Sequence, residues 1–484
     1  MALSKDTRFG IKSRLLWIAA IASGVAAGFV AWYVRTAPPS EDRRVNGLPE
    51  APTFKNDVRP PSGTLQAVYT LPYIPVGPYL EGTLRLPVGS VDDHKIKLGG
   101  VSGLWRDHSD GPGIFWLVTD RGSNGQITVG TESRRTFPVP EFAPTILKVK
   151  LENGTIQILD SIPIKTRAGI GVTGLPNFLP TGSPESDEQA WDCPATTKLD
   201  PKQSGLDTED LVRTSDGNFW VVEEYRPSIL KVAPDGLVLK RFVPIDPVQP
   251  LASAGYAIVQ SLPSIYGFKR KQNRGFEGLA ISPNEKTLFA ALQSPLLNPT
   301  AAVGNASRNT RILVFDIESE QPVAEYVYRF DVPTIATYAT TDPSEMKISA
   351  VVALDSFRLL VDERTDAAAR LYSVDIRQAT NFLGTVFDTP ATTPLDPNVE
   401  SESAFAASGV VALPKELVID LSTIPGVPPK VEGVAVLDDG HTIAIGNDND
   451  LGLGTFTITP TTCTLSDSRQ NSLILFIKID KPLK

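Results

Sequence analysis

One pattern of hydrophobic and polar positions recurs along the chain. An apolar strand that begins with a Glu-Gly-Leu-Ala-like step is followed by a turn, a second apolar strand and a run of polar residues. The clearest copies are residues 276–295 and 431–450, and looser copies begin near residues 101 and 208. Repetition at this length predicts an array of similar units. Polar residues at the same place in each unit predict one shared site where the units converge.

The copy that begins near residue 208 predicts four short strands. After the first strand, Ser215-Asp216-Gly217 is a hairpin turn signal, and the aromatic and β-branched segment 218–222 favours a buried strand. Segments 227–232 and 237–243, joined by Asp235-Gly236, supply the third and fourth strands. The other first strands begin near residues 101, 276, 348 and 431.

Hairpin-rich units repeated in this way are typical of a β-propeller. Residues 64–90 are placed to close the ring beside the final strand, residues 473–479. We therefore expect an all-β fold, a β-propeller of about six four-stranded blades. A two-sheet sandwich is the alternative, because both folds share strand alternation and turn spacing.

The N-terminus predicts a membrane anchor. Residues 15–34 carry no charge and are long enough to cross a bilayer as a helix, and four basic residues precede them. A cleaved signal peptide is the alternative, but the segment ends in Ala31-Trp32-Tyr33-Val34-Arg35 without a clear Ala-x-Ala site. We expect a cytoplasmic segment 1–14, a transmembrane helix 15–34, a Pro-rich linker 35–62 and an extracytoplasmic propeller 63–484, periplasmic or at the cell surface. The expected partner of the helix is the lipid bilayer.

Composition argues against nucleic acid as a partner and leaves the pairing of the two cysteines undecided. The chain has 484 residues and a net charge of −9, without a Lys/Arg-rich tract in the main domain, which argues against nucleic-acid binding. The 37 Gly and 41 Pro fit many turns. Cys193 and Cys463 are the only cysteines. In an exported protein they could form a disulfide, but two cysteines far apart in sequence do not decide it.

Common catalytic motifs are absent, and only three histidines occur. Carboxylates and amides at repeated positions remain. The ends of the second strands align at Asp120, Glu224, Gln293, Glu363 and Asp448, and the starts of the first strands at Ser102, Glu209, Glu277 and Glu432. Oxygens that converge from several blades suit Ca²⁺, which takes six to eight oxygen ligands. We predict a Ca²⁺ site with these ligands: Asp120, Glu209, Glu277, Glu363, Glu432 and Asp448.

Arginines lie near the same strand ends, where guanidinium groups could hold a phosphate or carboxylate. The predicted catalytic residues are Glu224, Arg226, Arg121 and Arg364. The predicted substrate-binding residues are Arg274, Gln293 and Asn447. The alternative is architectural, with glutamates that hydrogen-bond a neighbouring blade and arginines that pair with those carboxylates.

Three segments resemble a known family. They are residues 273–283 with 288–295, residues 216–227, and residues 431–435 with Asn447-Asp448-Asn449-Asp450. Together they are similar to the phytase-like esterase family, and the resemblance extends over about residues 64 to 480. It implies an exported β-propeller with an esterase or phosphoesterase role.

The sequence therefore predicts a Ca²⁺-assisted hydrolase of phosphate or carboxylate esters, whose partner is a small-molecule ester or phosphoester substrate. Two alternatives stay open. One is a non-enzymatic binding propeller at the cell surface, in which the carboxylates are structural. The other is a lactonase-type sugar-acid hydrolase, because such propellers also use a cation bound by Glu, Asn and Asp.

Overall fold

Antiparallel strands make up most of the computed structural model, which describes residues 62–74, 76, 96–178, 187–246, 251–390, 398–459 and 462–483. These residues belong to one unit that spans residues 60–484. The expected cytoplasmic segment, transmembrane helix and linker, up to residue 61, lie outside the described residues. Among the residues that are described, no helix is long and apolar enough to cross a membrane.

The strands pair in sheets of one design, in which each strand is antiparallel to the next. The first three sheets are β2 (Val101–Trp105), β3 (Ile114–Thr119), β6 (Thr145–Glu152) and β7 (Thr155–Pro163); β9 (Thr208–Arg213), β10 (Phe219–Glu223), β11 (Ser228–Val232) and β12 (Val238–Pro244); and β14 (Phe276–Ile281), β15 (Thr287–Leu292), β16 (Asn309–Asp316) and β17 (Gln321–Arg329). A parallel strand, β13 (Ala257–Leu262), extends the second sheet beside β12.

The last two sheets continue the design. The fourth is β18 (Lys347–Ala353), β19 (Arg358–Arg364), β20 (Ala369–Asp375) and β21 (Lys415–Asp420). The fifth is β22 (Val431–Val436), β23 (Thr442–Asn447), β26 (Leu473–Ile479) and β1 (Gly63–Thr70), and a parallel pair of Thr70 with Thr155 of β7 joins it to the first sheet in one eight-stranded sheet. The repeated four-stranded unit expected from the sequence is therefore confirmed.

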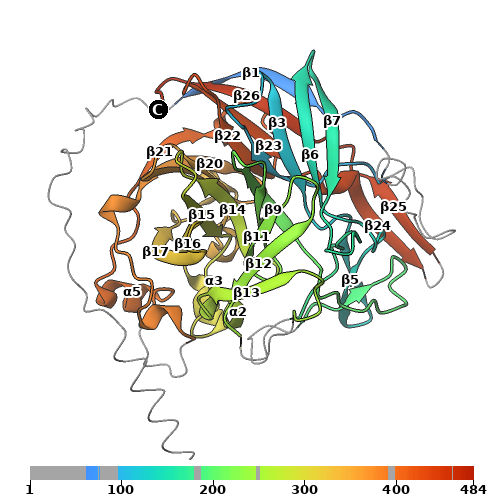
Figure 1. Cartoon of the computed structure of the whole chain (residues 1–484), viewed down its shortest axis with the longest axis horizontal. Coiled ribbons are helices and arrows are strands. Elements are labelled where there is room, and N and C mark those ends of the chain that lie inside the picture. Colours follow the sequence, from blue (N-terminus) through green and yellow to red (C-terminus); the bar gives the residue numbers. More distant parts are fainter. Residues whose placement is uncertain are drawn as a thin grey trace, which may run out of the picture. The chain divides into compact units, whose positions relative to one another are not determined.

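The innermost strands close a ring. Each innermost strand contacts the next one: β2 contacts β9, β9 contacts β14, β14 contacts β18, β18 contacts β22, and β22 contacts β2. In Figure 1 the sheets follow one another around this centre in the order of the sequence colours. Within the described residues the pairing gives five blades, so the expected number of about six is not confirmed. The reason is that residues 63–70 pair with β26 as the fourth strand of the fifth blade and do not form a further blade of their own.

Apolar side chains between neighbouring sheets hold the ring together. Trp220 of the second sheet lies against Phe242, and both contact Phe315 of the third sheet. All three belong to one buried cluster that extends across the interface between the two sheets. This packing explains the aromatic and β-branched composition of the repeated strands.

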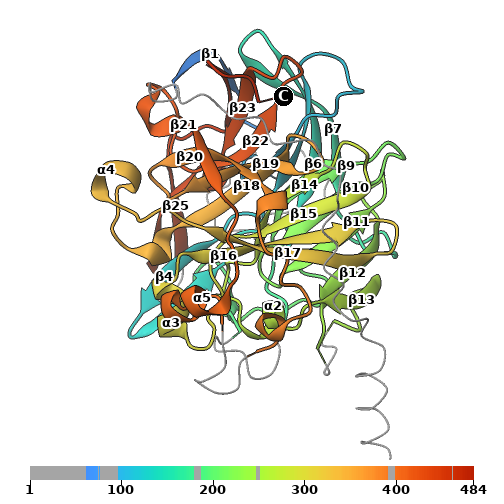
Figure 2. The same ribbon diagram turned by 90° about the vertical axis from the view of Figure 1, so that its left-hand side faces the viewer.

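Segments between strands add smaller elements. They include the sheet of β4 (Gly125–Val129), β5 (Glu132–Thr136) and β8 (Ala190–Trp191), the hairpin of β24 (Leu453–Thr459) and β25 (Thr462–Asp467), and the helices α2 (Ile265–Phe268), α3 (Ala301–Ala306), α4 (Ile335–Tyr338) and α5 (Glu402–Ser408). Five short 3₁₀ helices are also described: Pro343–Glu345, Ile376–Gln378, Val386–Asp388, Leu421–Thr423 and Asp450–Gly452. In Figures 1 and 2, α2, α3 and α5 all lie toward the lower end of the view.

Cys193 is disulfide-bonded. The chain contains one other cysteine, at position 463, whose side chain lies outside the described set.

Candidate metal and substrate site on the propeller axis

Each innermost strand has one more residue than its partner at the same place, close to its start. In β14, for example, Phe276 pairs with Leu292 and Gly278 with Ala291, so Glu277 has no partner across the ladder. Such a β-bulge leaves a residue unpaired and re-aims its side chain. The equivalent residues of the five strands are Ser102, Glu209, Glu277, Ser349 and Glu432.

Two further positions surround this bulge. In four sheets the residue after the second strand donates its N–H to the residue before the innermost strand, as Glu224 does to the Asp207 carbonyl at 2.8 Å. The strand register makes these residues at the ends of the second strands equivalent: Asp120, Glu224, Gln293, Arg364 and Asp448, of which Arg364 is the last residue of β19. Those at the starts of the innermost strands are Gly100, Asp207, Gly275, Lys347 and Lys430, of which Lys347 is the first residue of β18. We call these three sets of positions the axial ring.

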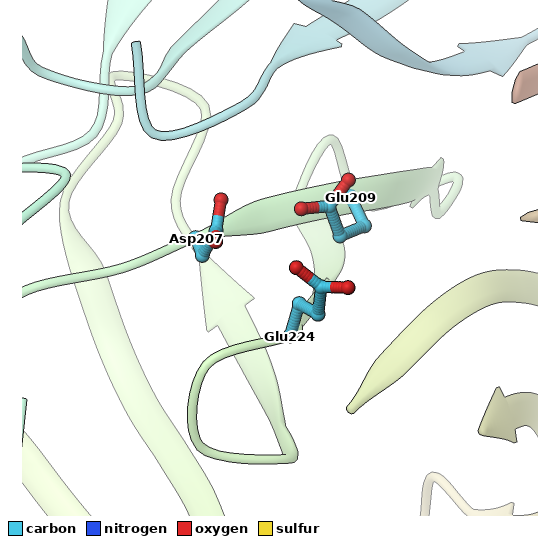
Figure 3. A group of neighbouring side chains, drawn as sticks. All are labelled: Asp207, Glu209 and Glu224. Atoms are coloured by element: carbon cyan, nitrogen blue, oxygen red, sulfur yellow. The ribbon is translucent and has the colours of Figure 1, made fainter. Parts of the chain in front are cut away.

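The second sheet brings three carboxylates together. Oxygens of Asp207, Glu209 and Glu224 all lie within 4.8 Å of one another, and Figure 3 shows the three side chains converging from the start of β9 and the turn after β10. All three residues are buried, at 3%, 7% and 3% exposure. The sequence analysis predicted Glu209 and Glu224 as site residues but missed Asp207.

Few positive charges offset this group. Arg121 pairs with Asp207 at 3.3 Å and with Glu188 at 2.8 Å. Burial raises the pKa values of Glu209 and Glu224 well above the usual range, and the charge of Glu277 raises both further. A bound cation would offset this burial and repulsion. We call Asp120, Asp207, Glu209 and Glu224 the carboxylate half of the axial ring.

Asp120 joins the carboxylate half from the first sheet. Burial raises its pKa well above the usual range, followed by the charges of Asp448 and Asp207. One Asp120 oxygen accepts the Gly122 N–H at 2.8 Å. The pKa of Asp120 therefore responds to charges of both the second sheet, through Asp207, and the fifth sheet, through Asp448.

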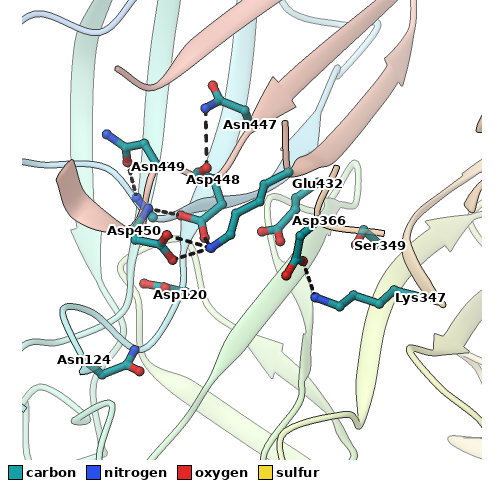
Figure 4. Close-up of polar contacts among 12 residues, drawn as sticks. Asp120, Asn124, Lys347, Ser349, Asp366, Glu432, Asn447, Asp448, Asn449 and Asp450 are labelled. Carbon is teal, nitrogen blue, oxygen red and sulfur yellow. Dashed lines mark hydrogen bonds and ion pairs between the residues drawn. The ribbon is translucent and has the colours of Figure 1, made fainter. Parts of the chain in front are cut away.

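The opposite side of the ring is built from ion pairs. Arg364 pairs with Glu432 and with Asp366, and its Nε donates to the Ser349 hydroxyl at 2.6 Å. Lys347 pairs with Asp366, and Figure 4 shows this contact beside Glu432. Lys430 pairs with Asp450 at 2.6 Å and lies 3.7 Å from Asp448. We call Lys347, Arg364, Lys430, Glu432 and Asp448 the ion-paired half.

Glu277 lies between the two halves. Burial raises its pKa to about 7, against the lowering effect of Arg364. The Ser349 hydroxyl donates to Glu277 Oε1 at 3.4 Å. Among the described residues, neither Glu277 Oε2 nor Gln293 Oε1 has a hydrogen-bond partner. Two buried acceptor oxygens are thus free next to the carboxylate half, which fits a set of donors for a hard cation.

Comparison with known proteins places the chain in a family. The model of a family described as "Phytase-like: Esterase-like activity of phytase" matches residues 96–451. The chain belongs to the phytase-like family. This confirms the resemblance found in the sequence, and the matched residues include the whole axial ring.

One relative of this phytase-like chain is an uncharacterized secreted protein of Arthroderma benhamiae, 29% identical over 302 residues. The alignment covers 56% of this chain and 59% of the relative, less than two thirds of the relative's length. Among solved structures, a luciferin-regenerating enzyme is matched over 79% of this chain and 92% of that chain, with 10% identity and a TM-score of 0.30. The Dos1 propeller is matched over 78% and 68%, with 9% identity and a TM-score of 0.30.

Two predicted site residues of the phytase-like domain have other partners. Glu363 pairs with Ile348 in the ladder, one residue before the ring position, which Arg364 occupies. Its oxygens accept from the hydroxyls of Tyr328 and Tyr338, the Asp331 N–H and Lys415. Successive residues of a strand point to opposite faces, so the one-residue slip takes Glu363 away from the other predicted ligands.

Arg226 likewise binds elsewhere. Its guanidinium pairs with the buried Asp246 at 2.8 Å and donates to the Phe178 carbonyl at 2.8 Å. The predicted substrate residue Asn447 accepts the Leu473 N–H at 2.8 Å and so ties β23 to β26. Arg274, by contrast, donates to the Ser294 hydroxyl at 3.0 Å, and the charges of Glu224 and Glu277 act on it.

The residues missed by sequence reasoning share one position. Asp207, Lys347 and Lys430 each lie at the start of an innermost strand, where the other two sheets have glycine. An alignment extended by one residue upstream would have found them. Glu188 comes from a long loop before β8, and no repeat signal marks it.

A cavity of about 650 Å³ lies at the other end of the innermost strands. Its walls are mixed, with apolar residues beside charged ones, among them Leu104, Leu279, Val351, Val434, Arg106, Asp107, Arg213 and Glu285. At its rim, His108 pairs with Asp438. No residue of the axial ring lines it. The unpaired acceptor oxygens and the clustered carboxylates lie at the axial ring instead.

Proposed function

We propose that this phytase-like protein is an exported, Ca²⁺-assisted hydrolase of phosphate or carboxylate esters. The observation that carries the proposal is the group of three buried carboxylates, Asp207, Glu209 and Glu224, with oxygens within 4.8 Å of one another. Buried carboxylates of like charge need a cation or must stay protonated. A hard divalent cation resolves this conflict with the oxygen ligands it prefers.

Asp207, Glu209 and Glu224 would hold the cation, with Asp120 and Gln293 beside them. When bound, Ca²⁺ would act as a Lewis acid on an ester carbonyl or phosphoryl oxygen. Glu277 Oε2, a buried acceptor without a partner among the described residues, would orient the attacking water. Arg274, which forms no ion pair with a described carboxylate, would hold the anionic part of the substrate.

Two observations support an extracytoplasmic location. The relative from Arthroderma benhamiae is named a secreted protein, and Cys193 is disulfide-bonded, as is usual in oxidising compartments. We propose that residues 15–34 anchor the chain in a membrane, with the propeller outside the cytoplasm. A cleaved signal peptide would give the same location without the anchor.

The experiment measures the thermal midpoint of the purified full chain with EDTA and with CaCl₂, followed by hydrolysis of p-nitrophenyl acetate and p-nitrophenyl phosphate. Ligand binding to the native state raises the midpoint, by about 2.7 kcal/mol of stability at a hundredfold excess over Kd. We expect a calcium-dependent rise, and hydrolysis of at least one ester that chelation abolishes.

The matched variants are Glu209→Gln with Glu224→Gln, and Asp438→Asn at the far cavity as the control. The double variant should lose both the calcium shift and the hydrolysis, and the control should keep both. A calcium shift without hydrolysis would favour the alternative, a binding propeller. That alternative is supported by the ion-paired half, in which carboxylates serve as partners of buried cations.

A further inference from the structure

Five arginine side chains are less than 2% exposed: Arg226, Arg241, Arg270, Arg311 and Arg364. Four of them pair with carboxylates: Arg226 with Asp246, Arg241 with Glu223, Arg311 with Glu325 and Glu400, and Arg364 with Glu432. Arg270 has no ion pair with any carboxylate of the described residues. Since burial of an unpaired charge is costly, this guanidinium is the exception that needs an explanation.

The contacts of Arg270 leave one edge of the guanidinium free. Nη1 donates to the Lys271 carbonyl at 3.2 Å, and the guanidinium carbon lies 4.8 Å from the centre of the Tyr225 ring. Nε and Nη2 have no hydrogen-bond partner among the described residues. These two N–H groups lie on the same edge of the guanidinium. Arginine uses such a fork to bind the two oxygens of a carboxylate or phosphate.

Arg270 lies next to the carboxylate half. It follows α2 in the segment that leads to β14 and Glu277. Tyr225, on which it stacks, directly follows Glu224, and the Tyr225 hydroxyl accepts the N–H of Glu188 at 2.8 Å. Burial lowers the pKa of Arg270, while Tyr225, Glu223 and Glu224 favour its charged form. None of these carboxylates comes within ion-pairing distance, so the two N–H groups of the fork stay buried and unpaired among the described residues.

We propose that the Nε–Nη2 edge of Arg270 is a binding site for a small oxyanion, a carboxylate or phosphate group of a ligand. The stacked Tyr225 ring holds the guanidinium plane in place, and the free edge supplies two parallel N–H donors. The bound anion completes the pairing that the other four buried arginines obtain from the chain. This site does not depend on the proposed hydrolysis or on a metal.

The test titrates the purified full chain with inorganic phosphate and, separately, with acetate, in EDTA and at constant ionic strength. We expect a saturable rise of the thermal midpoint with at least one anion, and the stronger of the two identifies the preferred group. Arg270→Lys keeps the charge but loses the fork. It should weaken binding by about tenfold or more, the value of one charge-assisted hydrogen bond. The control is Arg226→Lys, whose parent arginine is already paired, and it should leave anion binding unchanged.

Two results would overturn the proposal. One is a wild-type midpoint that responds to neither anion. The other is an Arg270→Lys variant that responds like the wild type, which would make Arg270 a packing residue stacked on Tyr225. If Arg270→Lys does not fold, isothermal titration of the wild type and of Arg274→Lys decides: one saturable site that Arg274→Lys retains supports the proposal, and the absence of binding heat with both anions, or its loss in Arg274→Lys, rejects it.

Discussion

The two halves of the axial ring use the same backbone positions with opposite results. At the start of the innermost strand, the carboxylate half has Asp207 and the ion-paired half has Lys347 and Lys430. At the end of the second strand, Asp120 and Glu224 in one half correspond to Arg364 and Asp448 in the other. The propeller thus supplies equivalent positions, and the residue type at each one decides whether carboxylates or cationic side chains gather there.

The difference has an energetic consequence. In the ion-paired half Glu432 pairs with Arg364, and Asp448 lies 3.7 Å from Lys430; burial raises the pKa values of both carboxyls, and these cations act to lower them. In the carboxylate half, burial and mutual repulsion raise the pKa values of Glu209 and Glu224, and neither carboxylate forms an ion pair with a described residue. Buried carboxyls with shifted pKa values of this kind are typical of functional sites.

Arg364→Met should have the largest effect, because it breaks the centre of the ion-paired half. The substitution removes the partner of the buried Glu432 and the donor to Ser349. Loss of one partner of a buried pair costs about 3–5 kcal/mol. We expect the free energy of unfolding in urea to fall by this amount.

The control for this prediction is Arg358→Met. Arg358 pairs with Asp355 where both side chains are about a third exposed or more, and such pairs contribute about 1 kcal/mol or less. If both variants lost the same free energy of unfolding, the ion pairs of the buried Arg364 would contribute no more to stability than the exposed pair of Arg358.

Much of the fold could be predicted from the sequence, because turn signals such as Asp216-Gly217 and Asp235-Gly236 are local. The number of blades could not, since it depends on the pairing of residues 63–70 with residues 473–479, at opposite ends of the chain. At the site, the Glu-Gly steps marked Glu277 and Glu432 correctly as equivalent positions.

The sequence alignment placed Glu363 on the axial ring instead of Arg364, and this one-residue error has a local cause. The fourth unit lacks the Glu-Gly step, and its bulge adds a residue that sequence spacing does not reveal. Between the adjacent Glu363 and Arg364, a search for carboxylates selects the glutamate, although the strand register places the arginine on the ring. Asp207 was missed for the opposite reason, because its equivalents Gly100 and Gly275 show no polar side chain at that position.

Glu363→Gln should have a smaller effect on the free energy of unfolding. It tests whether Glu363 stabilises the fold or binds the metal. Glu363 accepts four hydrogen bonds or ion pairs from Tyr328, Tyr338, Asp331 and Lys415. The amide loses one acceptor oxygen and the charge, which costs about 1–3 kcal/mol. We expect lower unfolding free energy in urea but an unchanged calcium-dependent shift of the thermal midpoint.

The matched variant is Glu402→Gln, at an exposed pair with Arg329, which should cost about 1 kcal/mol or less. If Glu363→Gln abolished the calcium shift, Glu363 would belong with the metal ligands after all.

The smallest effect is a difference in pH dependence between the halves, measured as the free energy of unfolding in EDTA. Glu209 and Glu224 have pKa values above the model-compound value of 4.5 in the folded chain. Their carboxyls lose protons more readily when the chain unfolds, so stability falls as the pH rises above about 4.5, by at most about 1.4 kcal/mol per pH unit for each group. Asp366 behaves oppositely. Burial acts to raise its pKa, but Lys347 and Arg364 lower it below 3.8, so its contribution is lost as the pH falls below that value.

Two single substitutions separate these contributions. Glu209→Gln should flatten the decline above pH 4.5, because it removes one titrating carboxyl from the carboxylate half. Asp366→Asn should flatten only the acid limb, because it removes the carboxyl that pairs with Lys347 and Arg364 of the ion-paired half. If Glu209→Gln left the fall of the unfolding free energy above pH 4.5 unchanged, repulsion among the buried carboxylates would not destabilise the folded chain as proposed. Added CaCl₂ provides the internal check: a cation bound to the ionised carboxylates should remove the decline in the wild type and have little effect in the Glu209→Gln variant.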